Sequence, residues 1–245
     1  MDAPKPQLHS ATIVKKQQLT AHVVLFTFKP VTPASMQFTA GQYGSFVIDE
    51  KTRRQYSFCS SPHDPAAFEV VIDTTPMGPG SKFFFSKNTG DSVSFMAPLG
   101  VFVLDKTTNR KKVMVATGTG VAPLRSMILD YLGGAWRSQV SLRERTDDMT
   151  LYWGMRHEED LYWVGEFQEL SARYPHFRFV LTLSKPSPSW KGTSGRVTSH
   201  VVQEEQNAPG TDFYLCGNRL MIKDIETQLL AKNVPVAQIH KEMYF

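Results

Sequence analysis

The chain has 245 residues, of which 41% are hydrophobic and 20% charged, as is typical of a globular protein with room for one large domain or two modest ones. Its formal net charge of +4 is too small to indicate nucleic-acid binding, although a mildly basic surface would suit an acidic protein partner. No apolar run approaches membrane-spanning length, "MDAPKPQLHS" has no signal-peptide core, and two cysteines cannot build a disulfide framework, so we expect a cytoplasmic protein without a membrane span.

The first part of the chain, residues 10–104, shows short strand patterns separated by Gly, Pro and Asp. Strands are predicted at residues 22–30, 41–49, 54–60, 67–73 and 91–97, and one short helix at 80–86. Several short strands in succession indicate an antiparallel β-barrel or sandwich.

From residue 111 the pattern changes to alternating strands and helices. Strands are predicted at 111–117, 149–154, 176–184 and 211–217, and helices at 122–132, 164–174, 197–204 and 218–232. This alternation predicts an α/β domain with a doubly wound parallel sheet. The polar segment 105–110 places the domain boundary between residues 1–107 and 108–245, and the unpatterned stretch 133–148 is expected to be a mobile surface loop.

A glycine-containing turn, "ATGTGVAP" (residues 116–123), follows the first strand of the second half and opens a helix. Gly118 and Gly120 would let the backbone approach a ligand closely, and the helix start offers free N–H groups to a pyrophosphate. Pro123 fits the first helical turn. The plainer alternative is an ordinary tight strand-to-helix turn.

A second strand that ends in glycine, "YLCGN" (residues 214–218), also precedes a helix. Because ligands of open parallel sheets bind beyond the carboxyl ends of the strands, Cys216 would face the same crevice as Gly118. The alternative is a buried structural cysteine.

Two further motifs belong to the first half. In "RQYSFCSS" (residues 54–61) the period of two places Arg54 and Tyr56 on one side of a strand, where a ring can stack and a guanidinium can bind phosphate. "MGPGSKFF" (residues 77–84) offers a second phosphate-binding helix start. The alternatives are an edge strand with a surface arginine and a plain loop capped by Ser81.

Taken together and in this order, these motifs resemble the ferredoxin–NADP reductase superfamily over nearly the whole chain. The resemblance rests on "FTAGQYGSF" (38–46), Arg-x-Tyr-Ser (54–57), "GPGS" (78–81), "PLGVFVL" (98–104), "GTGVAP" (118–123), "LYWGMR" (151–156), "CGN" (216–218) and a short aromatic C-terminus.

The resemblance implies that the barrel domain binds FAD and the α/β domain binds a nicotinamide nucleotide. It implies that Arg54 holds the FAD pyrophosphate, Tyr56 packs against the flavin, Ser57 lies near flavin N5, and Gly80 and Ser81 bind the pyrophosphate. Further FAD contacts are implied for Gln55, Val71, Ile72 and Gly78. Contacts to the nicotinamide nucleotide are implied for Thr117, Gly118, Thr119, Gly120, Pro123, Cys216 and Gly217, and no metal ligand is implied.

The choice between NADH and NADPH depends on residues 183–197. By the resemblance, Ser184, Lys185 and Arg156 are candidates to contact the 2′-phosphate of NADPH. The run W-x-G-x-x-G-R-V (residues 190–197) is more similar to NADH-dependent oxygenase reductases, and we favour NADH.

The resemblance also implies an electron acceptor. The main interpretation is a monomeric reductase that feeds a separate ferredoxin, flavodoxin or oxygenase component, since two cysteines cannot hold an iron–sulfur cluster. A basic cluster of Lys51, Arg53, Lys111 and Lys112 is a candidate contact for an acidic partner. The alternatives are a reductase of small acceptors such as free flavin, ferric chelates or quinones, and a non-catalytic subunit that holds FAD within a larger complex.

The chain ends on "HKEMYF" (residues 240–245). In relatives a terminal ring covers the flavin face and an acid assists proton movement or nicotinamide placement, so Glu242 is implied as that acid and either Tyr244 or Phe245 as that ring. The alternative is a last strand packed on the sheet, and both interpretations can hold together.

Overall fold

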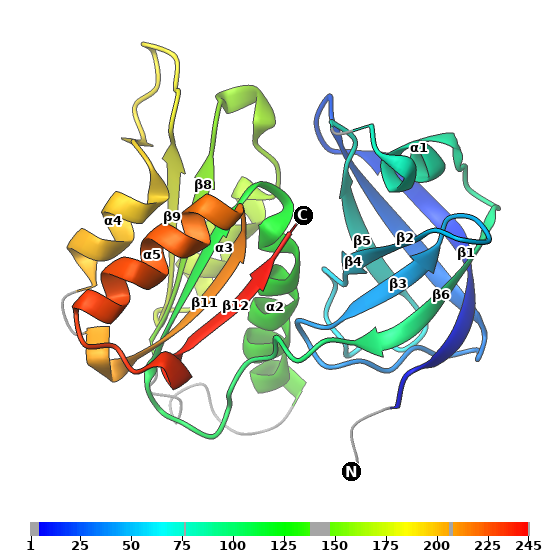
Figure 1. The fold of residues 1–245 in the computed structure, drawn as a ribbon, viewed down its shortest axis with the longest axis horizontal. Coiled ribbons are helices and arrows are strands. Elements are labelled where there is room, and N and C mark those ends of the chain that lie inside the picture. Colours follow the sequence, from blue (N-terminus) through cyan, green and yellow to red (C-terminus); the bar gives the residue numbers. More distant parts are fainter. Residues whose placement is uncertain (1–4, 76, 138–147, 206–207, 245) are drawn as a thin grey trace. The chain divides into compact units, whose positions relative to one another are not determined.

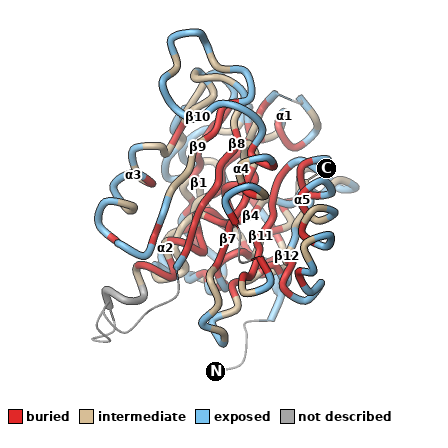
Figure 2. The backbone as a smooth tube through the Cα atoms, turned by 90° about the vertical axis from the view of Figure 1, so that its left-hand side faces the viewer, coloured by how far each residue is buried: buried red, intermediate tan, exposed pale blue. Residues whose placement is uncertain are grey.

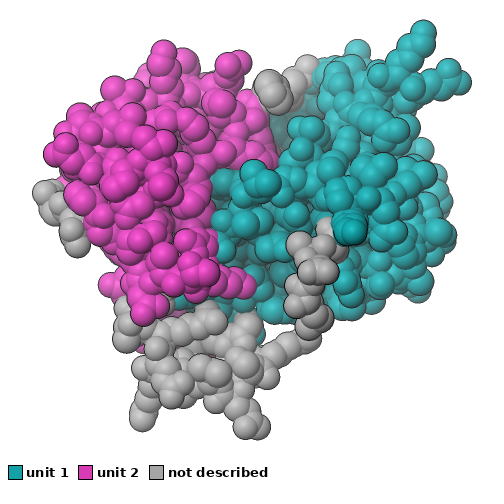
Figure 3. Space-filling view, turned by 60° about the horizontal axis from the view of Figure 1, so that its bottom comes forward, with its two compact units in different colours: residues 1–104, 122–139 teal, residues 105–121, 140–245 magenta. Residues whose placement is uncertain are grey.

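The computed structural model describes residues 5–75, 77–137, 148–205 and 208–244. The chain forms two compact units: residues 1–104 with 122–139 (unit 1) and residues 105–121 with 140–245 (unit 2), shown in separate colours in Figure 3. The division after residue 104 lies close to the expected boundary at residue 107, and residues 1–107 and 108–245 stay the proposed domains.

In the described part of unit 1, six strands form an antiparallel sheet in the order β4-β3-β6-β1-β2-β5 (Figure 1). Their bounds are β1 Gln7–Gln18, β2 Val23–Thr32, β3 Tyr43–Val47, β4 Arg53–Ser57, β5 Phe68–Asp73 and β6 Ser92–Leu99. An antiparallel bridge joins Phe58, just past β4, to Val70 of β5. Because this bridge links the two edge strands, the sheet closes toward a barrel, and the predicted antiparallel barrel is confirmed.

Phenylalanine rings fill the barrel. Phe28, Phe46 and Phe95 from three strands are fully buried, and the helix α1 (Pro79–Ser86) inserts Phe84 among them, 5.4 Å from the Phe46 ring. The strands alternate buried and exposed positions, as expected when one face of a sheet lines a core. Phe84 therefore fixes α1, and its first turn, over the end of the barrel.

In the described part of unit 2, six parallel strands follow the order β10-β9-β8-β7-β11-β12. Their bounds are β7 Lys111–Thr117, β8 Met149–Met155, β9 Phe177–Leu183, β10 Thr193–Ser194, β11 Thr211–Gly217 and β12 Ile239–Met243. The chain steps outward from β7 to β9 on one side and from β11 to β12 on the other. The strand order thus reverses between β7 and β11, which is the usual ligand position of doubly wound sheets.

Helices cover both faces of this sheet. Their bounds are α3 Val164–Arg173, α4 Val197–Glu204 and α5 Arg219–Ala231. Val201 of α4 and Ile225 of α5 pack with Val115 of β7 on one face, whereas Phe167 of α3 contacts Trp153 of β8 on the other. Figure 2 shows the central strands buried between these layers. The predicted doubly wound parallel sheet is confirmed.

Three sequence expectations need correction. The first strand, β1, was not predicted as a separate element. The helix α2 (Val121–Arg137) continues five residues beyond its predicted end at 132, so residues 133–137 are helix rather than loop, whereas 138–147 lie outside the described residues.

None of the helices in the described part of the chain has the length and apolar character that a membrane span requires.

The third correction concerns the basic cluster, because Lys112 is buried and Lys111 is engaged in an ion pair. Lys112 is 1% exposed, and its Nζ donates to the carbonyl oxygens of Thr108 (3.0 Å) and Arg110 (2.9 Å). Lys111 pairs with the buried Glu205 at 2.7 Å. Lys112 therefore belongs to the interior of unit 2 and is not available to a docking partner, and the partly exposed Lys111 already binds a carboxylate of its own unit.

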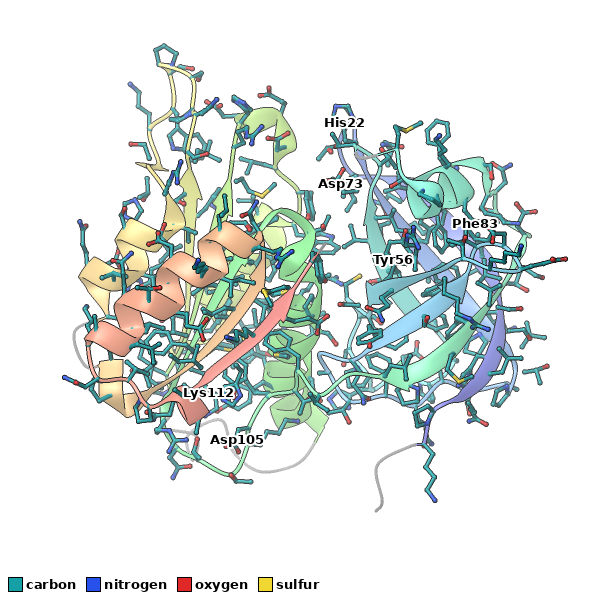
Figure 4. The ribbon with its side chains drawn as sticks, in the orientation of Figure 1. His22, Tyr56, Asp73, Phe83, Asp105 and Lys112 are labelled. Atoms are coloured by element: carbon teal, nitrogen blue, oxygen red, sulfur yellow. The ribbon has the colours of Figure 1, made fainter. Side chains whose placement is uncertain are left out.

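Lys112 is part of a network that holds the segment before β7. The buried Asp212 accepts hydrogen bonds from Arg110 Nε (2.9 Å) and Thr108 Oγ1 (2.8 Å), and the Asp105 N–H donates to Tyr214 Oη at 2.9 Å. Figure 4 marks Asp105 and Lys112 at this end of the sheet. The segment 105–110 is therefore fixed to β7 and β11, away from the carboxyl ends of the strands, where ligands of open parallel sheets usually bind.

Candidate functional sites

In unit 1, the first turn of α1 lies directly against β4. A Cβ atom added at Gly80 would lie 2.2 Å from Tyr56 Oη and 2.9 Å from Arg54 Cγ. Arg54 and Tyr56 therefore share one face of β4, as the period of two predicted, and only glycine lets α1 approach them this closely. The structure brings together three of the residues that the sequence singled out for FAD.

The start of α1 presents backbone donors at this place. Gly78 is the N-cap residue, and Gly80 and Ser81 follow Pro79 in the first turn, whose N–H groups have no partner within the helix. Ser81 is 7% exposed, and its hydroxyl donates to the Asp73 carbonyl at 3.1 Å, which leaves its lone pairs as acceptors. Figure 4 labels Tyr56 and Asp73 in this part of unit 1.

Tyr56 combines a packed ring with a phenol at the edge of the site. Its ring meets Phe84 edge-on at 5.2 Å and Phe46 at 5.8 Å. Burial raises the pKa of Tyr56 to about 12, although the positive charge of Arg54 opposes the shift. Tyr56 is therefore a neutral, fixed ring at physiological pH.

The remaining unit 1 candidates have different environments. Ser57 is 4% exposed, whereas Gln55 is exposed. Ile72 belongs to the barrel core, and Val71 points to the opposite face of β5, where it is 5% exposed. The side chain of Ile72 therefore packs in the barrel core, and the implied FAD contacts of Val71 and Ile72 stay predictions.

In unit 2, the two glycine turns interlock at the point where the strand order reverses. A Cβ at Gly120 would lie 2.5 Å from the Cys216 carbonyl oxygen, and a Cβ at Gly217 would lie 2.5 Å from Thr117 Oγ1. Gly217 also has φ +125°, a conformation open to glycine. These two glycines are required by the close approach of the β7 and β11 ends.

Gly118 differs from both. It opens the 3-10 helix η1 (Gly118–Gly120) with φ +55°, and a Cβ built there would meet no atom within 4 Å. Its carbonyl accepts a hydrogen bond from Trp153 Nε1 at 3.0 Å. Gly118 and the half-buried Thr119 thus border open space on a turn whose position is fixed, which suits a bound pyrophosphate.

Thr117 and Asn218 join the ends of β7 and β11. The Asn218 N–H donates to Thr117 Oγ1 at 2.9 Å, and Asn218 Oδ1 caps α5 by accepting from the Leu220 N–H at 2.8 Å. Pro123 is buried in the first turn of α2, in a segment that groups with unit 1. The proposed contact of Pro123 with nucleotide stays a prediction.

On the side of β11 away from β7, β12 places the C-terminal residues beside Cys216. Cys216 pairs in register with Glu242, and the Tyr244 N–H donates to the Gly217 carbonyl at 3.3 Å. Cys216 is fully buried, so desolvation raises the pKa of its thiol, helped by the Glu242 charge and opposed by a hydrogen bond to the Tyr244 side chain. The terminal segment is an edge strand of the sheet, and Phe245 lies outside the described residues.

The third group of candidates lies at the ends of β8 and β9. The N–H groups of Ser184 and Lys185 donate to the carbonyls of Met155 (3.0 Å) and Arg156 (2.9 Å). Arg156, Ser184 and Lys185 are therefore neighbours, and all three are exposed. The structure brings these three residues together, and their contact with the 2′-phosphate of NADPH stays a prediction.

Sequence reasoning missed two residues at this edge, Glu158 and Ser187. Glu158 belongs to the 3-10 helix η3 (Glu158–Asp160), and it binds Ser187 across 29 positions of sequence. No local pattern could reveal this contact. The tryptophan that fixes Gly118, Trp153, was also missed, because its place on a buried strand already explains an apolar residue.

The residues present fit two dinucleotides, one in each unit. In unit 1, a guanidinium, a fixed ring and free backbone donors converge where a Cβ at Gly80 would block access. In unit 2, the turn at Gly118 lies at the centre of the strand ends. The basic and hydroxyl residues Arg156, Lys185 and Ser184 lie on one side of it, and Cys216, Glu242 and Tyr244 lie on the other. Both sets match phosphate and aromatic-ring chemistry.

Comparison with known proteins agrees with this geometry. Residues 10–104 match the family model of the oxidoreductase FAD-binding domain, and residues 114–227 match that of the oxidoreductase NAD-binding domain.

Among curated proteins, ferredoxin–NADP reductase B of Sorangium cellulosum is 27% identical, with 96% of each chain covered. The reductase subunit of an aromatic O-demethylase from Amycolatopsis sp. is 30% identical over 85% of this chain, which spans 61% of that relative.

Two solved structures share the fold. The Amycolatopsis cytochrome P450 reductase GcoB matches with a TM-score of 0.86 at 26% identity, over 99% of this chain and 71% of that one. A ferredoxin NADP+ reductase from Neisseria gonorrhoeae, solved with bound FAD and NADP, matches with a TM-score of 0.80 at 23% identity, over 97% and 99%. The chain belongs to the ferredoxin–NADP reductase superfamily.

Proposed function

We propose that this chain is an FAD-dependent reductase that takes hydride from NAD(P)H onto FAD and passes the electrons singly to a ferredoxin, a flavodoxin or an oxygenase component. One observation carries the proposal: the FAD-binding and NAD-binding family matches fall on two units that each have their own glycine-lined phosphate site. When bound, FAD supplies the chemistry, because it accepts two electrons as hydride and releases them one at a time.

For unit 1, the proposal assigns binding and orientation to β4 and α1. Arg54 holds the FAD pyrophosphate by charge-assisted hydrogen bonds, together with the N–H groups of Gly80 and Ser81. Tyr56 supports the flavin with a ring that Phe84 and Phe46 fix edge-on. Ser57 follows on the same strand, and its role near the reacting nitrogen is proposed from the family alone.

For unit 2, the proposal places the nicotinamide nucleotide across the carboxyl ends of the parallel strands. The pyrophosphate lies at Gly118 and Thr119, and the adenosine half extends over β8 and β9, two strand spacings or roughly 10 Å away. The nicotinamide half lies toward Cys216, Glu242 and Tyr244, where a buried thiol and a ring replace the cations of the other side.

The acceptor is proposed from the relatives. Their names include a ferredoxin–NADP reductase, an aromatic O-demethylase reductase subunit and a toluate 1,2-dioxygenase electron transfer component. The 245 residues hold two cysteines, Cys59 and Cys216, both buried, so an iron–sulfur acceptor would lie outside them.

Steady-state assays with different acceptors test this choice. We expect kcat/KM to be at least about tenfold higher with a one-electron carrier protein of low reduction potential, such as a [2Fe–2S] ferredoxin, than with free flavin or a ferric chelate. Equal or better turnover of the small acceptors would favour the second candidate, a small-acceptor reductase. Ferricyanide serves only as a control for flavin reduction, since it accepts electrons from nearly any reduced flavin.

A further inference from the structure

Near the ends of β8 and β9, the half-buried carboxylate of Glu158 binds a residue of a distant segment of the chain. Glu158 accepts three hydrogen bonds from Ser187: the N–H donates to Oε1 at 3.0 Å and to Oε2 at 3.2 Å, and the hydroxyl donates to Oε1 at 2.5 Å. Both donors of Ser187 are consumed by this one carboxylate. The same bonds hold the pKa of Glu158 below its ordinary value, so the group is ionised at neutral pH.

The segment that carries Ser187 is ordered by further contacts. Ser187 Oγ also lies 2.8 Å from Ser189 Oγ, and the Trp190 N–H donates to the Ser187 carbonyl at 3.1 Å. The Trp190 ring covers Gly192, where a Cβ would lie 2.4 Å from the ring, and its Nε1 donates to the Thr193 carbonyl at 3.1 Å. The loop therefore has a defined shape around the Glu158 carboxylate.

Hydroxyl and backbone donors bind this carboxylate, and two basic residues lie nearby along the two segments. Lys185 is two residues before Ser187, and its N–H is bonded to Arg156, which is two residues before Glu158. A backbone N–H, a serine hydroxyl and two neighbouring basic residues form the donor set that a phosphate monoester needs. Here those serine donors bind a carboxylate of the chain itself.

We propose that Glu158 sets the nucleotide preference by occupying, as an internal anion, the niche that the 2′-phosphate of NADPH would require. The inference rests on the proposed function and deepens it toward NADH. The ribose 2′-hydroxyl of NADH needs no such niche, whereas a 2′-phosphate would meet a fixed negative charge and a serine without free donors. Removing the carboxylate should open the niche.

The test compares Glu158→Ala with the matched variant Glu159→Ala, which removes the same charge from the adjacent, exposed position of η3. Dissociation constants of ADP-ribose and 2′-phospho-ADP-ribose are measured by calorimetry on the FAD-loaded protein. We expect the wild type to bind ADP-ribose more tightly. The Glu158→Ala variant should bind 2′-phospho-ADP-ribose at least about tenfold more tightly than the wild type does, while its affinity for ADP-ribose should be unchanged.

Further outcomes separate the alternatives. Adding Ser187→Ala to Glu158→Ala should abolish the gain, because the freed donors are lost. If Glu158→Ala weakens both ligands equally, Glu158 only orders the loop and the inference is overturned. An equal gain in affinity for 2′-phospho-ADP-ribose in Glu159→Ala would show that any removed negative charge has this effect, and it would also overturn the inference about Glu158. If the wild type binds neither ligand, the proposed function itself fails.

Discussion

The interlocked turns of unit 2 give the sharpest structural prediction, for Gly120→Ala. The added methyl would lie 2.5 Å from the Cys216 carbonyl oxygen, 2.6 Å from its carbonyl carbon and 2.6 Å from Gly217 Cα, where Cβ contacts below 3.0 Å essentially never occur. All three atoms are backbone. Cys216 is held in register by Ala116 on one side and Glu242 on the other, so β11 cannot retreat.

The expected cost follows from this overlap. Overpacking of a closed interior costs about 1–3 kcal/mol, and backbone neighbours place Gly120→Ala toward the upper end of that range. Since domains are stable by about 5–15 kcal/mol, unit 2 should still fold, with its melting temperature lowered by on the order of 10 °C. Because η1 must move, nucleotide binding should weaken by at least about tenfold, since a displacement of about 1 Å in a positioned site is costly.

Thermal unfolding and anaerobic NADH titration of the FAD-loaded protein measure both effects. Gly165→Ala is the matched control, because the Cβ of an alanine there meets no atom within 4 Å and the position lies in α3. That control should be neutral or stabilising by about 0.5–1 kcal/mol. FAD content should be unchanged in both variants. A Gly120→Ala protein with wild-type melting temperature and NADH affinity would refute the reasoning from close approach.

Three further predictions concern both units. Arg54→Ala should weaken FAD binding by about tenfold to a hundredfold, as for the loss of a charged hydrogen bond, whereas Arg53→Ala should leave it within about threefold; flavin fluorescence titration decides. Deleting residues 244 and 245 should change nucleotide affinity or turnover while FAD stays bound, and unchanged kinetics would return the terminus to a purely packing role. Tyr56 and Tyr214 have pKa values raised to about 12, so above pH 10 the unfolded chain releases protons that the folded chain keeps. Stability should therefore fall between pH 10 and 12, and denaturant unfolding at pH 9 and 11.5 would show no difference if these tyrosines were exposed.

Local periodicity predicted most of the fold. The strands of the second half were found because continuous apolar runs such as "KKVMVAT" are typical of buried parallel strands. β1 was missed because Gln, Lys and His interrupt its apolar positions. The end of α2 was placed too early because Gly133 and Gly134 weaken a helix, yet here the helix continues through both.

The candidate sites also contain some residues that local sequence patterns reveal and others that only the folded structure reveals. Glycines at a helix start or a strand end are local signals, so the sequence singles out Gly80, Gly118, Gly120 and Gly217, and the structure shows a close backbone or side-chain approach at Gly80, Gly120 and Gly217. Two properties depend on tertiary contacts and were beyond reach: the burial of Lys112 against backbone carbonyls, and the contact of Glu158 with Ser187. Charge patterns in the sequence do not reveal which cations are buried, and this is why the basic cluster was wrong.

The central claim is that this chain binds FAD and that a nicotinamide nucleotide reduces it. The most direct measurement is a visible spectrum of the purified, FAD-loaded protein, followed by titration with NADH and NADPH without oxygen. We expect a yellow protein whose flavin absorbance is bleached by an equimolar amount of NADH, and less readily by NADPH. A colourless protein that fails to bind added FAD, or a bound flavin that neither nucleotide bleaches, would contradict it.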